Sequence, residues 1–169
     1  MIVLNNDTRS LQVILGGAVT TNQLPFVINY IHTNRSFSES LNSTNGVTNS
    51  GTAVTMLAAP SIGEKRSIQS LFIPNNDTAA ASVTIRLNDN GTLRNIIPSC
   101  SLSSNDALIY TSASGWYVLS AAGFIKSTST AVNLDDLGDV TITAPVTGAT
   151  LIYNGTAWVD GQLDLADAD

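Results

Sequence analysis

The clearest pattern in the chain is an alternation of apolar and polar residues over residues 83–88. Residues 89–91, Asp-Asn-Gly, follow it, and apolar residues return over residues 92–97. Two alternating segments around Asn-Gly are typical of a β-hairpin, because Asn and Gly accept the positive φ of its turn. We expect Pro98 to end the second strand. The predicted inward-facing residues of the main core are Val83, Ile85, Leu87, Trp116 and Val118.

Other short apolar and β-branched runs are separated by turn residues throughout the first two thirds of the chain. They predict strands over residues 1–4, 11–15, 26–31, 52–58, 67–73, 108–110 and 116–119. Apolar residues in 67–73 fall in mixed phase, so this strand is expected to be covered on both faces. Strands at spacings of about eight to twelve residues indicate a sandwich or barrel. We therefore predict an all-β main domain, a β-sandwich of jelly-roll-like type.

Residues 33–51 are rich in Ser, Thr and Asn. The pattern favours an exposed loop, with a short hairpin at Asn45-Gly46. The alternative reading is a loop that contacts a partner.

A separate pattern occupies residues 134–159. Leu134, Leu137 and Val140 fall three residues apart with aspartates between them, which suits one acidic turn of helix with an apolar edge. Residues 151–159 read as a hairpin around Asn154-Gly155, flanked by aromatic residues.

The two aromatic residues of that hairpin are Tyr153 and Trp158. A two-stranded hairpin is marginal in water, so this segment is expected to pack against another chain or domain. We predict an interface formed by Leu134, Leu137, Val140, Tyr153 and Trp158. The sequence Leu-Ile-Tyr at 108–110 with Trp116 resembles the hairpin's own Leu-Ile-Tyr and Trp158, so the same hairpin type is expected twice.

Small and polar residues near 121–130 mark a linker. The predicted organisation is a β-sandwich domain over 1–123, a linker over 124–133, and a C-terminal module with an acidic tail over 134–169.

The segment LDDLGDVTITAPVTGATLIYNGTAWVDG resembles a short module of tailed-phage virion proteins, especially fibre, baseplate and other appendage proteins. Its order of parts is an L-x-D-L-x-D-V segment, P-x-x-G, and an L-x-Y-N-G-x-x-W hairpin. Residues 1–123 also resemble a β-domain of phage and prophage virion proteins, through LQVILGGAVTTNQLPFV and NNDTAAASVTIRLNDNG. The resemblance implies a virion component that is made in the host cytoplasm. It also implies a homotrimer with other virion proteins as partners.

Composition and charge argue against several other classes of protein and of binding site. Charged residues make up 12% of the chain, about half the usual share of near 25%. The net charge of −6 argues against a nucleic-acid partner, which would select a basic patch. No signal peptide and no membrane span are predicted. Cys100 is the single cysteine, which excludes an intrachain disulfide and a cysteine zinc site, and it is expected to be buried.

Candidate chemistry is sparse. His32 is the single histidine, and its neighbours lack a nucleophile elbow, so a structural role is expected. Asp135, Asp136 and Asp139 lack the spacing of a calcium loop, and helix N-terminal carboxylates explain them better. No enzyme activity, metal or cofactor is predicted.

Three functions remain open from the sequence. The first is a small tail-fibre, baseplate or tail-appendage subunit, which the 134–159 segment favours. The second is a capsid decoration protein, which the compact size favours. The third is a receptor-binding module that stacks its aromatic side chains on a host-surface glycan.

Overall fold

The computed structural model describes residues 1–126, 140–141, 150–153 and 156–161. The chain divides into two compact units, Met1–Lys126 and Ser127–Asp169. Residues 124–126, which we placed in a linker, lie in the first unit. All regular secondary structure in the described ranges is β-strand, in agreement with the predicted all-β class.

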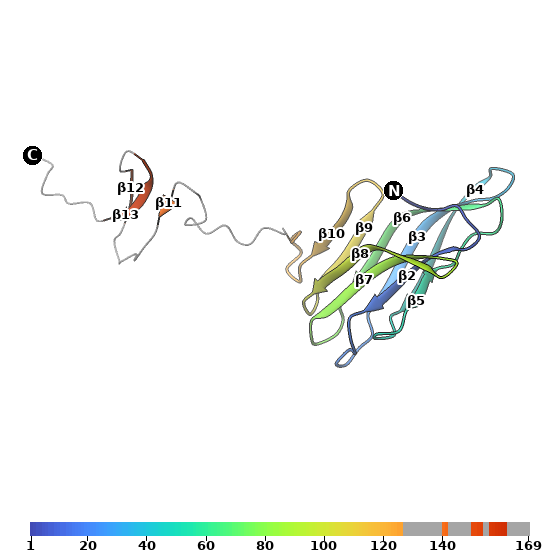
Figure 1. The fold of residues 1–169 in the computed structure, drawn as a ribbon, viewed down its shortest axis with the longest axis horizontal. Helices are drawn as coiled ribbons and strands as arrows, with labels where there is room; N and C mark the ends of the chain where they lie inside the picture. The colour runs from blue at the N-terminus through green and yellow to red at the C-terminus, as the bar shows by residue number, and fades with distance from the viewer. Residues whose placement is uncertain (127–139, 142–149, 154–155, 162–169) are drawn as a thin grey trace, which may run out of the picture. The chain divides into compact units, whose positions relative to one another are not determined.

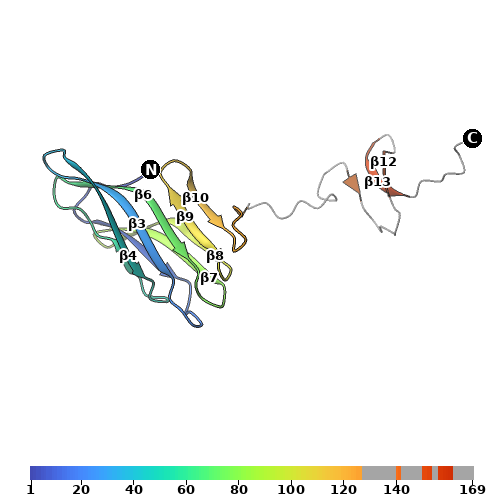
Figure 2. The same ribbon diagram turned by 180° about the vertical axis from the view of Figure 1, so that it is seen from behind.

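Two antiparallel sheets form the first unit (Figure 1). The six-stranded sheet has the order β10-β9-β6-β3-β4, with β1 also paired to β6; its strands are β1 (Ile2–Leu4), β3 (Pro25–Thr33), β4 (Glu39–Val47), β6 (Lys65–Pro74), β9 (Ala107–Thr111) and β10 (Gly115–Leu119). The four-stranded sheet has the order β5-β2-β7-β8; its strands are β2 (Arg9–Leu15), β5 (Val54–Leu57), β7 (Ala81–Asp89) and β8 (Thr92–Leu102). Seen from behind, β4 forms one margin of the six-stranded sheet (Figure 2).

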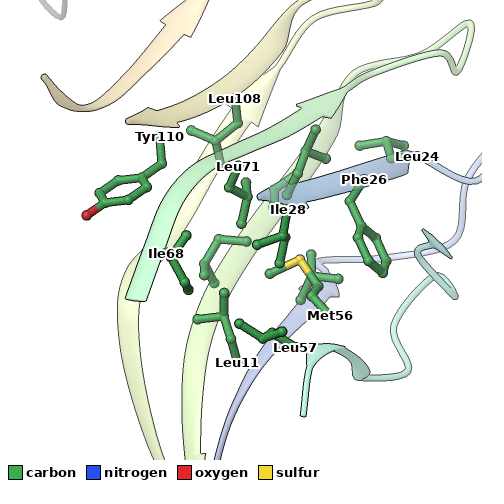
Figure 3. Close-up of a cluster of buried hydrophobic side chains, with 14 of the residues drawn as sticks. Leu11, Leu24, Phe26, Ile28, Met56, Leu57, Ile68, Leu71, Leu108 and Tyr110 are labelled. Atoms are coloured by element: carbon green, nitrogen blue, oxygen red, sulfur yellow. The ribbon is translucent and has the colours of Figure 1, made fainter. Parts of the chain in front are cut away.

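One hydrophobic core lies between the sheets, as expected for a β-sandwich. Figure 3 shows Ile28 of one sheet and Leu11 of the other among its closely packed side chains. The core side chains that are less than 2% exposed are Leu4, Leu11, Val13, Leu24, Ile28, Ile68, Leu71, Ile73, Val83, Ile85, Leu102 and Leu108. Each such side chain stabilises the fold by about 1.5–3 kcal/mol relative to an exposed one.

The predicted core residues all lie in or against this core. Val83 and Ile85 are fully buried. Leu87, Trp116 and Val118 are only partly buried and pack against the buried cluster. The inward side of the β7–β8 hairpin was therefore predicted correctly, but Trp116 is not enclosed.

The turn between β7 and β8 has the predicted form. Asp89 pairs with Thr92, which leaves two residues in the loop, and these have positive φ: 50° at Asn90 and 87° at Gly91. Our expectation that Pro98 ends the second strand is wrong, because β8 continues to Leu102. β8 is an edge strand, and proline is tolerated where its missing N–H would face solvent.

A β-bulge explains the mixed phase of β6. Ser70 pairs with Asn29 and Ile68 with Tyr30, so Gln69 is an extra residue. The bulge lets Ile68 and Leu71 both face the core, although they are three residues apart. Our prediction that both faces of this strand are covered is wrong, since Phe72 remains 42% exposed on the outer face.

The polar stretch at 33–51 is largely a strand, not a loop. β4 pairs with β3 in unbroken register, from Pro25↔Val47 to Thr33↔Glu39. Gly46 allows this close pairing, because the ring of buried Phe26 lies over it; an added Cβ would lie 2.6 Å from the Phe26 Cζ atom. The β3 ladder and this contact stabilise a strand that carries few apolar residues of its own.

The second unit contains a small three-stranded sheet. Its strands are β11 (Val140–Thr141), β12 (Thr150–Tyr153) and β13 (Trp158–Gly161). The central strand β13 pairs antiparallel with β12 and parallel with β11. The predicted hairpin is therefore present. Its register leaves four residues, 154–157, between Tyr153 and Trp158, so the connection is longer than a two-residue turn.

Candidate functional site

The described part of the second unit presents an exposed aromatic pair. Tyr153 and Trp158 are directly opposed on β12 and β13, with ring centroids 5.4 Å apart and planes tilted by 47°. Cross-strand aromatic pairs of this geometry stabilise a hairpin. Yet the residues are 55% and 44% exposed. The pair therefore stabilises the small sheet and still offers apolar surface to a partner.

The structure accounts for part of the predicted interface. It brings Tyr153 and Trp158 together, and it places Val140 in β11, where it pairs with Trp158. Leu134 and Leu137 lie outside the described residues. So do Asn154-Gly155 and residues 134–139 of the expected acidic helical turn, including Asp135, Asp136 and Asp139. Val140, which we placed on the apolar edge of that turn, is instead a strand residue.

The first unit contains a similar cross-strand pair of Tyr and Trp, in which the tyrosine is buried. Tyr110 and Trp116 are opposed on β9 and β10, with centroids 4.9 Å apart and the same tilt of 47°. Tyr110 is only 3% exposed, and its hydroxyl accepts a hydrogen bond from the Ile2 N–H at 2.9 Å. The repeat of Leu-Ile-Tyr and Trp thus corresponds to a repeated hairpin. Only the copy in the second unit leaves its tyrosine exposed.

Buried carboxylates in the first unit hold loops in place. Asp77 is 2% exposed and accepts hydrogen bonds from the backbone N–H groups of Thr20, Thr21 and Asn22 at 2.7, 2.6 and 3.1 Å. The Thr20 N–H, followed by the Thr21 and Asn22 groups, holds the pKa of Asp77 far below its usual range, although burial opposes this shift. This carboxylate is therefore fully engaged in joining the β2–β3 and β6–β7 connections.

A second buried carboxylate ties down the end of the first unit. Asp106 accepts hydrogen bonds from Ser103 N–H at 2.8 Å and from Lys126 Nζ at 2.5 Å. Burial alone would raise the pKa of Asp106, but Lys126 and the backbone donors lower it below its usual value. The sequence did not predict the structural role of either carboxylate, because their partners are distant in the chain and no motif of fixed spacing marks them.

The remaining candidate residues have structural surroundings. His32 is half-buried, and its Nε2 atom lies 3.5 Å from a Glu64 carboxylate oxygen. Cys100 was expected to be buried; it is partly buried against the core, and burial raises the pKa of its thiol. Within the described ranges, no group of three or more His, Cys, Asp or Glu side chains is arranged to hold a metal ion. The described residues also contain no helix long and apolar enough to cross a membrane.

No protein-family model, curated protein or solved structure matches this chain.

Proposed function

We propose that this protein is a non-enzymatic structural subunit of a tailed-phage virion, and specifically a small tail-fibre, baseplate or tail-appendage component. The observation that carries the proposal is the exposed Tyr153–Trp158 pair, which lies in the segment that resembles virion modules. Apolar rings exposed on a three-stranded unit are typical of an interface. The carboxylates of Asp77 and Asp106 already accept hydrogen bonds from groups of the protein, which supports a structural rather than a catalytic role.

The subunit assembles as a homotrimer in this proposal, with the second unit making the contact between copies. Burial of an aromatic ring stabilises an interface by about 1.5–3 kcal/mol at full burial, before the cost of association. The jelly-roll-like class of the sandwich and a helical turn at 134–139 complete the proposed organisation.

Sedimentation of the full chain tests the assembly step. At low protein concentration, where weaker contacts between copies dissociate, the wild type should sediment at three times its 17.7 kDa mass, and a Tyr153→Ser/Trp158→Ser variant should sediment as a smaller species with an unchanged β spectrum. Phe37→Ser is the matched control, because Phe37 is an aromatic residue that is 87% exposed on the first unit. A trimer that survives the double substitution would exclude the aromatic pair as its interface.

Capsid decoration is the second candidate. The compact sandwich of residues 1–126, which has no shaft, favours it. Electron microscopy of particles labelled with an antibody to this protein separates the candidates, since label on the tail supports an appendage and label on the head supports decoration. Binding on a glycan array that requires Trp158 would instead support the receptor-binding alternative.

A further inference from the structure

The outer edge of β4 offers an unused row of backbone hydrogen-bonding groups. Two bonds set the phase of the β3–β4 ladder: Thr48 N–H to the Leu24 carbonyl at 2.9 Å, and Asn34 N–H to the Ser38 carbonyl at 3.0 Å. In an antiparallel pair the bonded residues alternate, so the even-numbered residues of β4 bond β3. The N–H and C=O groups of the odd-numbered residues therefore point away from the sheet. Among the described strands, β4 pairs only with β3.

The other edges of the sandwich are protected. β8 contains Pro98 and two irregularities of register against β7. β5 and β1 are only four and three residues long. β10 is five residues long, and its C-terminal end is covered by its own continuation, through a bridge between Leu119 and Ile125 and a bond from Lys126 N–H to the Val118 carbonyl at 2.7 Å. These are the usual devices against edge-to-edge pairing.

β4 has none of these devices. It is nine residues long, its register against β3 is unbroken, and it contains no proline, lysine or arginine. Its single charged residue, Glu39, is at its first position. Exposed apolar residues stand near its two ends, with Leu41 75% exposed and Val47 56% exposed. A long, regular, uncharged edge is a template for pairing with another strand.

We propose that β4 pairs antiparallel with β4 of a second copy of this chain, about a two-fold axis at Thr44. This register places Leu41 opposite Val47 of the second copy, and Val47 opposite Leu41, so both exposed apolar residues are paired. Directly opposed side chains of this kind have Cβ atoms about 4.5–5.5 Å apart and stabilise a sheet. The pairing joins the two six-stranded sheets edge to edge.

The self-complementary placement of Leu41 and Val47 favours a second copy as the occupant, and charge permits it. The chain carries a net charge of −6, so acidic residues must stay apart at a contact between copies. In the proposed register the two Glu39 residues lie ten residues apart along the strands, about 34 Å at about 3.4 Å per residue. This distance exceeds the Debye length of about 8 Å at physiological salt, so repulsion between them is screened.

A charge-swap cycle in the full chain tests both the occupant and the register. Leu41→Lys and Val47→Glu should each weaken self-association in sedimentation, and the double variant L41K/V47E should restore it, because each Lys then faces a Glu of the other copy. Two cross-strand pairs at about 0.2–1 kcal/mol each correspond to a change of roughly two- to thirty-fold in the association constant. Both residues are exposed, so the single variants should keep the β spectrum of the wild type. Single variants that associate like the wild type, or a double variant weaker than both, would overturn the register.

Amide exchange measured by nuclear magnetic resonance gives a second readout. With β4 paired, the amides of Leu41, Ser43 and Asn45 should be protected at high protein concentration and lose protection on dilution. The amides of Asn42 and Thr44, which bond β3, should remain protected throughout and serve as the internal control. Free exchange of the odd-numbered amides at every concentration would refute the pairing. A trimer that persists with those amides unprotected would refute it while leaving the aromatic interface of the second unit intact.

Discussion

Gly46 is the position where a single methyl group should disturb the sandwich most clearly. An added Cβ would lie 2.6 Å from the Cζ atom of Phe26, whose ring is 3% exposed and fixed in the core. Overpacking a core costs typically about 1–3 kcal/mol. Alanine also removes the conformational cost of glycine, which is roughly 0.5–1 kcal/mol. We therefore expect Gly46→Ala to lower the free energy of unfolding by about 0.5–2 kcal/mol.

Urea unfolding followed by circular dichroism measures this change. Gly51→Ala is the matched control, because a Cβ at Gly51 meets nothing within 4 Å, and it should leave stability unchanged or slightly raised. In a Phe26→Leu background the ring is absent, so Gly46→Ala should no longer destabilise. If Gly46→Ala raises stability in the wild-type background, the close packing of β4 against Phe26 is not as described.

Three further outcomes follow from the contacts in the first unit. The folded pKa of Asp77 is depressed below its unfolded value near 3.8, so its stabilising effect is present above that pH and is lost as the pH falls. Asp77→Asn should therefore make the urea unfolding midpoint less dependent on pH between 5 and 3. An unchanged dependence of the midpoint on pH would contradict this. Lys126→Met should lower the free energy of unfolding by roughly 1–3 kcal/mol, since it leaves Asp106 buried without its charged partner, and a neutral effect would show that the bond contributes nothing. Trp116→Ala should cost less than the roughly 3–5 kcal/mol of a fully enclosed Trp, because Trp116 is partly exposed, and an equal or larger loss in denaturant titration would contradict its placement.

The sequence predicts the β7–β8 hairpin well, because alternation and turn chemistry both act locally. Asn90 and Gly91 adopt the positive φ that their dipeptide favours. The exposed aromatic hairpin of the second unit was also predictable, since Tyr153 and Trp158 flank an evident turn.

The missed features depend on contacts between distant residues. β4 lacks an alternation of apolar and polar residues. It forms because it pairs with β3 along its whole length and because the Phe26 ring packs over Gly46. The phase of β6 is decided by a bulge at Gln69, which no local signal marks. The role of Asp77 depends on a loop more than fifty residues away in the chain, since Thr20 and Asp77 are 57 residues apart. Tertiary context of this kind overrides local propensity.

Cryo-electron microscopy of purified particles from the host that carries this gene tests the central claim most directly. The account predicts density that fits the two-sheet unit of residues 1–126 on the particle surface, repeated about a three-fold axis, and peptides of this chain in the same particles by mass spectrometry. Purified, infective particles that contain no peptide of this chain and no such density would contradict a structural role in the virion.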